Sequence, residues 1–298
     1  MHSRIFITKP QKDYVLIDSG DCMKLERYGT VTIARPDPQA LWKKSLPDSE
    51  WKKADAYFAK EGGEEERGRW VITRPSMPEA WSIAYGGLKL EVKLTPFKHT
   101  GLFPEQLNNW QWCKEIIEEA IGSGDYARPT VLNLFGYTGG ASLSAALAGA
   151  EVTHVDASRA AITWANKNAE LSNLADKPIK WMLEDAVSFV KREIRRGKKY
   201  NGIIMDPPSF GRGAKGEIWR IEEDFIPLFD DCLKLLSDSP LFIVINGYAA
   251  GYSPIAYENN LRQMIGQFGG TIESGELAIE DQSGRLLPCG IVSRWKRS

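Results

Sequence analysis

The stretch TVLNLFGYTGG (Thr130–Gly140) reads as a buried β-strand that runs directly into a glycine-rich turn. Its apolar and β-branched residues favour an extended backbone, and the three glycines that follow favour a turn. The residues after it, Gly140–Gly149, have the apolar spacing of a helix. A strand, a turn and a helix in this order form the first part of a βαβ unit, which predicts a parallel sheet.

The same alternation continues toward the C-terminal end of the sequence. Four further strands are predicted at Glu151–Asp156, Ile179–Glu184, Gly202–Asp206 and Leu241–Asn246. Helices are predicted between them at Ser158–Leu171, Asp185–Arg196 and Trp219–Ser237. Two last segments, Thr271–Glu280 and Gly290–Lys296, predict a hairpin that adds an antiparallel edge. The fold class is therefore α/β, with a doubly wound, seven-stranded, Rossmann-like sheet.

The first hundred residues have a different pattern. Short strand-like runs, broken by turns, occur at YVLID (14–18), GTVTIA (29–34), RWVITR (69–74) and LKLEVKL (88–94). One helix-like stretch lies around Ser49–Lys60. We predict a small strand-rich α+β region over residues 1–100, with a role in substrate recognition, and a second domain over residues 101–298.

Composition limits the compartment and the partners. The 298 residues carry a net charge of −1, which excludes general attraction to nucleic acid but not a local basic patch. The four cysteines are far apart and form no CxxC pair, so disulfides and zinc sites are not expected. Three histidines without ligand spacing predict no metal site. With no apolar run of membrane-spanning length and no signal-peptide pattern, a cytoplasmic protein is expected.

Chemistry-bearing residues follow the ends of successive predicted strands. The strands end in LNLFGYTGG (Leu132–Gly140), HVDAS (His154–Ser158), MLEDA (Met182–Ala186) and MDPPSF (Met205–Phe210). Each acid has a plain structural alternative as a helix cap, and a glycine turn is common in α/β proteins. Their occurrence at neighbouring strand ends, where doubly wound sheets bind ligands, favours a binding site.

The residue types at these ends suit an adenosine-containing cofactor. Glycines in the first turn let a ligand approach the backbone closely. Asp156, 20 residues after Gly136, lies where a carboxylate accepts hydrogen bonds from ribose hydroxyls. Asp185 follows the next strand and suits the adenine amino group. The turn FGYTGG departs from the GxGxxG pattern, which argues against a nicotinamide dinucleotide.

The sequence DPPSF (Asp206–Phe210) predicts a second half of the site. Two prolines after an acid form a rigid turn that lacks two backbone N–H groups. The turn's carbonyl groups are suited to bind an amino group, and Phe210 is suited to stack on a planar substrate. The structural alternative is a proline-rich turn with Phe210 in the core.

At this point the chain resembles the class I S-adenosylmethionine-dependent methyltransferases over about residues 98–298. Within that class it is most similar to bacterial rRNA large-subunit methyltransferases of the cytosine-C5 type. The resemblance rests on KHTGLFPEQ (Lys98–Gln106), VLNLFGYTGGASL (Val131–Leu143), THVDAS (Thr153–Ser158) and MDPPSF. It implies a methyltransferase sheet, S-adenosylmethionine as cofactor, and an RNA base as substrate.

The resemblance also implies which residues contact the cofactor. Those in the segment that closes over it would be His99, Thr100, Phe103 and Gln106. Those along the strand ends would be Asn133, Phe135, Gly136, Tyr137, Thr138, Asp156, Ala157, Ser158, Asp185, Ala186 and Asp206. Asp156 would hold the ribose, Asp185 the adenine, and Asp206 would lie beside the transferable methyl group.

One departure changes the expected reaction. Methylation at cytosine C5 needs a cysteine thiolate, and neither DPPSF nor INGY (Ile245–Tyr248) contains a cysteine. DPPSF instead resembles the D/N-PP-aromatic motif of amino methyltransferases. That resemblance implies catalytic roles for Asp206, Pro207 and Phe210 in orienting an exocyclic amino group, without a nucleophile.

Two alternatives stay open for the function, and two segments bear on the substrate. The chain could methylate a small molecule or a protein, or serve as a non-catalytic scaffold that binds the cofactor. The stretch GRGAKGEIWR (Gly211–Arg220), with Lys215, is either a mobile loop that contacts phosphates or a solvated loop. A cationic run from Lys191 to Lys199 is expected at the opposite rim of the sheet, as a helix-end feature or as an RNA contact.

Overall fold

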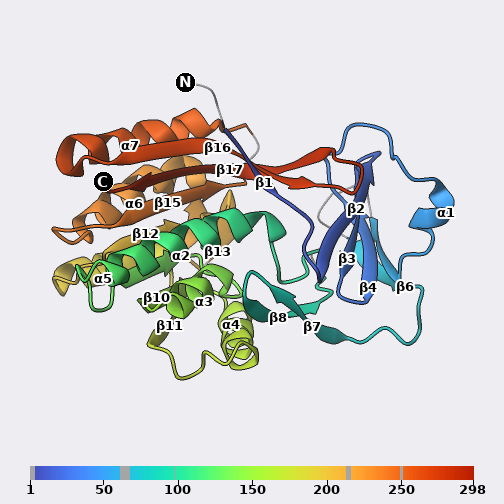
Figure 1. Cartoon of the computed structure of the whole chain (residues 1–298), viewed down its shortest axis with the longest axis horizontal. Helices are drawn as coiled ribbons and strands as arrows, with labels where there is room; N and C mark the ends of the chain where they lie inside the picture. The colour runs from blue at the N-terminus through green and yellow to red at the C-terminus, as the bar shows by residue number, and fades with distance from the viewer. Residues whose placement is uncertain (1–3, 61–67, 97, 213–215, 249–250) are drawn as a thin grey trace. The chain divides into compact units, whose positions relative to one another are not determined.

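The computed structural model describes residues 4–60, 68–96, 98–212, 216–248 and 251–298 (Figure 1). Eight strands form the main sheet: β1 (Arg4–Thr8), β9 (Thr130–Leu134), β10 (Glu151–Asp156), β11 (Ile179–Leu183), β12 (Gly202–Met205), β15 (Phe242–Gly247), β16 (Thr271–Glu280) and β17 (Leu286–Lys296). Their order across the sheet is β1-β16-β17-β15-β12-β9-β10-β11. The doubly wound α/β fold is confirmed, and β1 adds an eighth strand to the seven that the sequence predicts.

Five consecutive strands of this sheet are parallel, as the alternation of strands and helices predicts. They are β15, β12, β9, β10 and β11. Strand β17 runs antiparallel to β15, so the predicted terminal hairpin does form the antiparallel side of the sheet. The edge position of β1 explains why the sequence did not reveal it. Its apolar Ile5 and Ile7 are 53% and 37% exposed, so the strand has no clear buried pattern.

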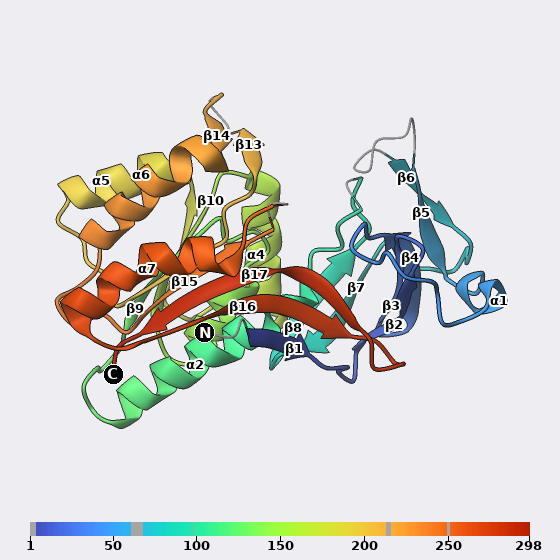
Figure 2. The same cartoon turned by 90° about the horizontal axis from the view of Figure 1, so that it is seen from above.

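Helices cover both faces of this sheet (Figure 2). They are α2 (Leu107–Gly122), α3 (Gly140–Leu147), α4 (Arg159–Leu171), α5 (Ala186–Arg195), α6 (Ile221–Lys234) and α7 (Pro254–Phe268). Figure 2 shows α5, α6 and α7 on one side and α2 on the other. Helices α5, α6 and α7 pack against β9, β12 and β15 in one apolar core. Within the described residues, no helix is long and apolar enough to cross a membrane.

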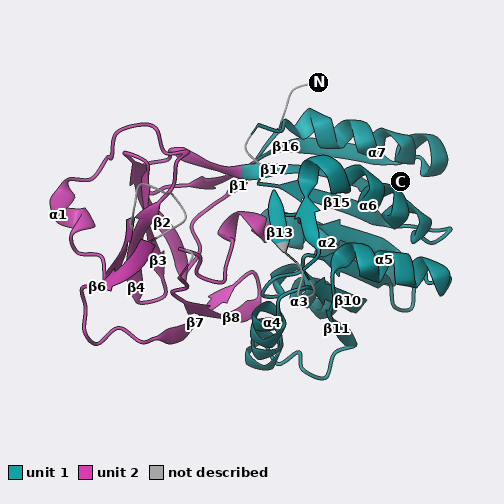
Figure 3. Ribbon diagram, turned by 180° about the vertical axis from the view of Figure 1, so that it is seen from behind, with its two compact units in different colours: residues 1–5, 108–276, 290–298 teal, residues 6–107, 277–289 magenta. Residues whose placement is uncertain are grey.

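The chain divides into two compact units, each made of separate segments (Figure 3). Unit 1 comprises residues 1–5, 108–276 and 290–298, and it contains most of the main sheet. Unit 2 comprises residues 6–107 together with residues 277–289, which form the tip of the β16–β17 hairpin. The prediction of a domain boundary at residue 100 stays a prediction.

Unit 2 is strand-rich. A five-stranded sheet contains β2 (Tyr14–Gly20), β3 (Met23–Tyr28), β4 (Val31–Pro36), β5 (Ala56–Lys60) and β6 (Gly68–Ile72), and a two-stranded sheet contains β7 (Ala80–Tyr85) and β8 (Leu88–Lys93). The predicted helix at Ser49–Lys60 is wrong, because only α1 (Asp48–Trp51) is helical. In β5, Phe58 is buried while Tyr57 is 42% exposed. This two-residue period is that of a strand.

The interior of unit 2 contains a buried ionic network. The Glu26 carboxylate is fully buried and accepts hydrogen bonds from Arg35 Nε at 2.6 Å, Tyr14 Oη at 2.9 Å and Tyr28 Oη at 3.0 Å. Burial alone would raise the pKa of Glu26, but Arg35, Lys24 and these hydrogen bonds outweigh it and lower the pKa to about 2. Glu26 is therefore a permanent anion at the centre of unit 2.

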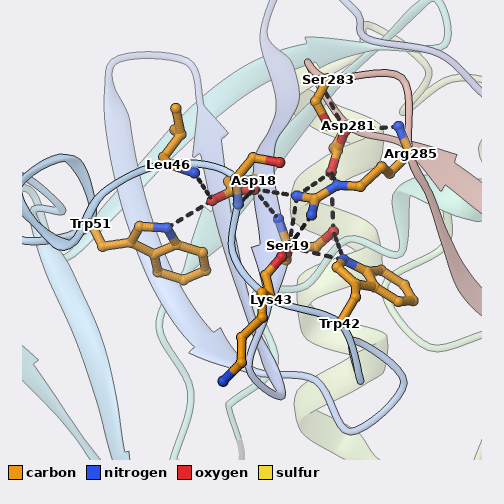
Figure 4. Close-up of polar contacts among 10 residues, drawn as sticks. Asp18, Ser19, Trp42, Lys43, Leu46, Trp51, Asp281, Ser283 and Arg285 are labelled. Carbon is orange, nitrogen blue, oxygen red and sulfur yellow. Dashed lines mark hydrogen bonds and ion pairs between the residues drawn. The ribbon is translucent and has the colours of Figure 1, made fainter.

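A second polar cluster ties the hairpin tip to the rest of unit 2 (Figure 4). The buried Asp18 carboxylate accepts hydrogen bonds from the Leu46 backbone N–H and from Trp51 Nε1, both at 2.9 Å. The Arg285 guanidinium forms ion pairs with Asp18 and with Asp281. The hydrogen bonds thus join residues at positions 18, 46 and 51 to residues of the hairpin tip.

Candidate active site

The carboxyl ends of four parallel strands lie side by side in unit 1. Leu134 of β9 pairs with Val155 of β10 and with Met205 of β12. Met205 in turn pairs with Ile245 of β15. The residues that follow are therefore neighbours along one edge: Phe135, Asp156, Asp206 and Asn246. The chain leaves β9 for β10 on one side, whereas β12 lies on the other, so the edge contains a topological switch point, where doubly wound sheets bind ligands.

The turn after β9 has a strained backbone. Phe135 and Tyr137, on either side of Gly136, have φ angles of 58° and 49°, in the left-handed region that non-glycine residues avoid. Tyr137 N donates a hydrogen bond to Asp156 Oδ2 at 2.8 Å, and Gly136 N donates to Val155 O at 3.0 Å. The neighbouring strand β10 thus holds the turn in a conformation that is typical of functional sites.

Packing beneath the turn requires glycine at two of its positions. A Cβ atom on Gly136 would lie 2.3 Å from the His154 ring, and one on Gly140 would lie 2.2 Å from the Trp110 ring. The sequence argument explained these glycines by the approach of a ligand. The structure gives a further reason, since the backbone rests directly on two aromatic rings.

His154 is a core residue. It is fully buried, and its Nδ1 lies 2.9 Å from Ser142 Oγ. Burial lowers the pKa of His154 to about 3, so the ring is neutral at physiological pH. Ser142 Oγ also accepts a hydrogen bond from Asn133 Nδ2 at 2.9 Å. Asn133, predicted to contact the cofactor, therefore lies in a buried polar chain under the turn, with Thr138 also buried nearby in sequence.

Asp156 is oriented by the backbone on both of its oxygens. Its Oδ2 accepts from Tyr137 N and its Oδ1 accepts from Ser158 N, each at 2.8 Å. Burial raises the pKa of Asp156, and these two hydrogen bonds oppose the rise. A carboxylate has about four lone-pair sites, so each oxygen keeps room for another donor. The arrangement suits a ribose, and the contact itself stays a prediction.

The other polar residues at this edge begin helices. Ser158, which follows Ala157, is the N-cap of α4. Its Oγ accepts a hydrogen bond from Ala161 N at 3.3 Å. Asp185 is the N-cap of α5, which starts at Ala186, and its Oδ1 accepts from Ser188 N at 2.9 Å. The capping interpretation of Asp185 is confirmed, whereas that of Asp156 is wrong, because the N-cap of α4 is Ser158. The adenine contact of Asp185 stays a prediction.

A tryptophan fixes the turn after β12. Trp219 Nε1 donates to the Pro208 carbonyl at 2.7 Å, and the Trp219 ring lies 5.1 Å from the Phe135 ring. Trp219 is thereby linked to both the first turn and the DPPSF turn. Sequence reasoning missed it, although a tryptophan inside a glycine-rich polar stretch was a usable signal.

Phe210 is not part of the core, so the structural alternative for this motif is wrong. Its ring is 53% exposed, although Pro207, earlier in the same turn, is buried. Phe210 begins β13 (Phe210–Arg212), which pairs with β14 (Ile218–Arg220) in a short ribbon. The described residues of the predicted loop therefore include two short paired strands, and Lys215 lies outside the described residues.

Two further residues beside Asp206 escaped the sequence argument. Asn246 is 2% exposed and accepts a hydrogen bond from Asn109 Nδ2 at 2.8 Å. Tyr257 of α7 is 3% exposed, and within the described part of the chain its buried hydroxyl has no hydrogen-bond partner. Burial, with the nearby Tyr252 and Asp206, raises the pKa of Tyr257 to about 12.

The remaining predicted cofactor residues belong to unit 2. The His99 ring lies 5.6 Å from the Phe103 ring, and Thr100 Oγ1 donates to Tyr28 Oη at 3.4 Å. Gln106 is buried at the end of a short 3₁₀ turn, Pro104–Gln106. Burial, together with nearby cations, lowers the pKa of His99 to about 4. The structure brings these residues together within unit 2, and their cofactor contacts stay predictions.

Comparison with known proteins identifies the family. The sequence model of the S-adenosylmethionine-dependent methyltransferases matches residues 64–258. The chain belongs to this family. A solved S-adenosylmethionine-dependent methyltransferase from Agrobacterium tumefaciens is 41% identical, with a TM-score of 0.92 over 99% of this chain and 94% of that one. The structure of SMU.776 complexed with S-adenosylhomocysteine has a TM-score of 0.69 at 22% identity, covers 96% of this chain and 76% of that one, and shows the same fold.

Curated relatives of this methyltransferase include enzymes named for ribosomal RNA. The Ribosomal RNA large subunit methyltransferase K of Neisseria meningitidis is 28% identical over 94% of this chain and 73% of its own length. The Ribosomal RNA large subunit methyltransferase K/L of Pseudoalteromonas atlantica is 29% identical over 68% of this chain. That match spans only 25% of the K/L protein, so the matched part of the chain corresponds to about a quarter of the longer relative.

The predicted enzyme class and its cofactor, S-adenosylmethionine, are thereby confirmed. The residues at the edge of unit 1 also fit that cofactor. Asp156 is held with lone pairs to spare for ribose hydroxyls. The N-cap of α3, Gly139, provides no side-chain cap for the first backbone N–H groups of the helix. Such an uncapped helix start suits a carboxylate like that of the cofactor's methionine part.

Proposed function

We propose that this methyltransferase transfers a methyl group from S-adenosylmethionine to an amino nitrogen of a base in RNA. The observation that carries the proposal is the half-exposed Phe210 ring, in the turn that begins at Asp206 at the switch-point edge. The names of the curated relatives, which refer to large-subunit ribosomal RNA, support RNA as the substrate class.

Three residues of the DPPSF turn have distinct roles in the proposed mechanism. The Asp206 carboxylate and the Pro207 carbonyl accept hydrogen bonds from the exocyclic amino group of the target base. The Phe210 ring stacks on the base. The hydrogen bond from Trp219 Nε1 to the Pro208 carbonyl keeps the turn rigid. S-adenosylmethionine supplies a methyl group on a positively charged sulfur. Alignment of the amino nitrogen with that methyl provides much of the rate.

Cysteine chemistry argues against methylation at a base carbon in this site. Cys113 and Cys232 of unit 1 are 3% and 1% exposed. Burial raises the pKa of Cys113 to about 12, and burial also raises the pKa of Cys232 far above its ordinary value. Neither thiol forms a thiolate near neutral pH, so neither provides the nucleophile that cytosine-C5 transfer requires. An amino acceptor needs no such nucleophile.

Transfer of tritiated methyl groups to total RNA tests the proposal. We expect the wild type to label RNA and Asp206→Ala to lose at least about a hundredfold in kcat, while calorimetric affinity for S-adenosylhomocysteine changes less than about threefold. Phe210→Ala should lose activity, whereas Phe210→Tyr should keep it because both rings stack. Asp231→Ala, on α6, is the matched control. Full activity of Asp206→Ala would remove the motif from the mechanism.

A small molecule or a protein is the second candidate substrate, favoured by the net charge of −1. Filter binding over a salt series separates the candidates, because RNA affinity falls steeply as salt rises. Labelling of small molecules or proteins from an extract, with none of RNA, would overturn the RNA proposal.

A further inference from the structure

A basic hollow lies at the edge of unit 1 opposite to the candidate active site. A cavity of about 180 Å³ opens there beside the first residues of β9, β10 and β11. Five cations line it: Lys180, Arg192, Arg196, Lys198 and Lys199. Two further cations, Lys191 and Arg195, lie exposed on the last turns of α5, next in sequence to lining residues but outside the lining of the cavity; we call all seven residues the basic hollow.

The basic hollow has more positive charge than its acids neutralise. Lys180 pairs with Glu151 at 2.5 Å, Arg196 pairs with Glu193 at 3.0 Å, and Arg192 pairs with Glu184. Within the described residues, the other four cations form no ion pair: Lys191, Arg195, Lys198 and Lys199. Seven cations against three acids leave a surplus of four positive charges on a chain whose net charge is −1.

Helix-end stabilisation does not account for this surplus. Cations near a helix C-terminus are favourable, which explains Arg192 and Arg195 in the last turn of α5. Lys180 belongs to β11, however, and Lys198 and Lys199 precede β12. Stabilisation of a helix end therefore does not explain why these three positions are cationic. Like charges gathered around a hollow repel one another. Binding of a polyanion reduces this repulsion and releases the counterions of the polyanion, which favours binding.

The position of the basic hollow matches an RNA substrate. Strand β9 has five residues, so its two ends lie about 15 Å apart at ~3.3 Å per residue. This length is a lower limit for an RNA whose target base lies at Asp206, because the RNA has to pass around the helices that cover the buried strands before it reaches the hollow. On the basis of the proposed function, we propose that the basic hollow binds phosphates of the same RNA and anchors it. A single nucleoside is too short to use this anchor.

Neutralising three exposed cations tests the anchor. We expect Lys191→Gln combined with Arg195→Gln and Lys198→Gln to weaken binding of ribosomal RNA fragments at least about tenfold at low salt. The slope of log affinity against log salt should fall by about 2, since each phosphate contact contributes about 0.7–0.9. KM for RNA should rise while kcat and the affinity for S-adenosylhomocysteine stay unchanged. The control loses the same charge elsewhere, through Lys114→Gln, Lys167→Gln and Arg262→Gln on α2, α4 and α7.

The outcomes separate this proposal from the function on which it rests. If the wild type methylates RNA and the triple variant keeps the wild-type salt slope, the anchor is overturned while the function stands. If both triple variants lose affinity equally, the effect is one of general charge, which also overturns the anchor. If the wild type methylates no RNA, the proposed function fails and the anchor fails with it; binding of acidic proteins or anionic vesicles through the hollow would then replace both.

Discussion

The two units place their charges in opposite ways. The core of unit 1 is mainly apolar, its Arg294–Glu273 ion pair is partly exposed, and the carboxylates predicted to bind ligands, Asp156 and Asp206, lie at strand ends. Unit 2 instead has the ion pair of Glu26 and Arg35 in its interior, shared with Tyr28. A buried ion pair adds little net stability, but its geometry is demanding and its disruption is costly. The comparison teaches that the carboxylates of unit 1 that are predicted to bind ligands lie at strand ends, whereas the charges of Glu26 and Arg35 stabilise the interior geometry of unit 2.

The strongest way to break this comparison is Glu26→Gln. The variant leaves Arg35 as a buried cation without its counter-charge, so the free energy of unfolding should fall by about 3–5 kcal/mol. Urea denaturation measures the change. Glu223→Gln, which removes an exposed pair with Arg220, is the control and should cost at most about 1 kcal/mol. An equal effect of the two substitutions on the free energy of unfolding would show that the buried network does not stabilise unit 2.

A shift of pH tests both units together. The pKa values of His99 in unit 2 and His154 in unit 1 are lowered to about 4 and about 3, against about 6.5 when unfolded. Below pH 6.5 these two histidines bind protons in the unfolded chain, but in the folded chain they stay neutral until the pH approaches their lowered pKa values. The free energy of unfolding therefore falls as the pH drops. Each histidine contributes about 1.4 kcal/mol per pH unit within this window.

Thermal unfolding between pH 7.5 and pH 5 measures this loss. His99→Asn should remove about half of the slope, because His154 then titrates alone. An unfolding temperature that does not change across the window would contradict both burial assignments.

Replacement of Asp156 sharpens the comparison for unit 1. Asp156→Ala should weaken the binding of S-adenosylhomocysteine by about 1–3 kcal/mol, the usual effect of leaving ligand hydroxyls without an acceptor. Calorimetry gives the affinity, and Glu151→Ala, at the other end of the same strand, is the control. Unchanged affinity would refute the ribose contact.

The smallest expected effect contrasts one tyrosine from each unit. Tyr257→Phe removes a buried hydroxyl that has no hydrogen-bond partner in the described residues, so stability should stay equal or rise by up to ~1 kcal/mol. Tyr28→Phe removes a donor to Glu26 and should lower stability by about 1 kcal/mol. Urea midpoints of the two variants decide, and changes of the same sign would contradict the contrast.

The sequence predicted the parallel sheet because each of its strands is a short apolar run that ends in a turn or an acid. It failed where this signal was weak or mixed. No helix bounds were predicted for α2 or α7, and Ala56–Lys60 was assigned to a helix although its residues alternate between buried and exposed. Strand β1 was missed because an edge strand need not show a buried face.

For the site, the sequence identified the residue types but not all of their supports. It placed Asp156 and Asp206 at the carboxyl ends of strands in one sheet, and the strand register shows that these strands, β10 and β12, lie on either side of β9. It did not reveal that Gly136 rests on His154, or that Trp219 is linked to both turns. These contacts join residues that are far apart in the chain, and a single sequence carries no signal of such pairings.

The hairpin tip that completes unit 2 has a consequence for biosynthesis. Asp18 meets Arg285, a partner 267 positions later, so the ribosome must deliver nearly the whole chain before this cluster can close. Until then the N-terminal strands emerge without the residues that complete unit 2, and incompletely folded chains are prone to aggregation. A ribosome stalled before Arg285 would therefore hold a chain in which neither unit is complete, because β17 of the main sheet also follows that residue.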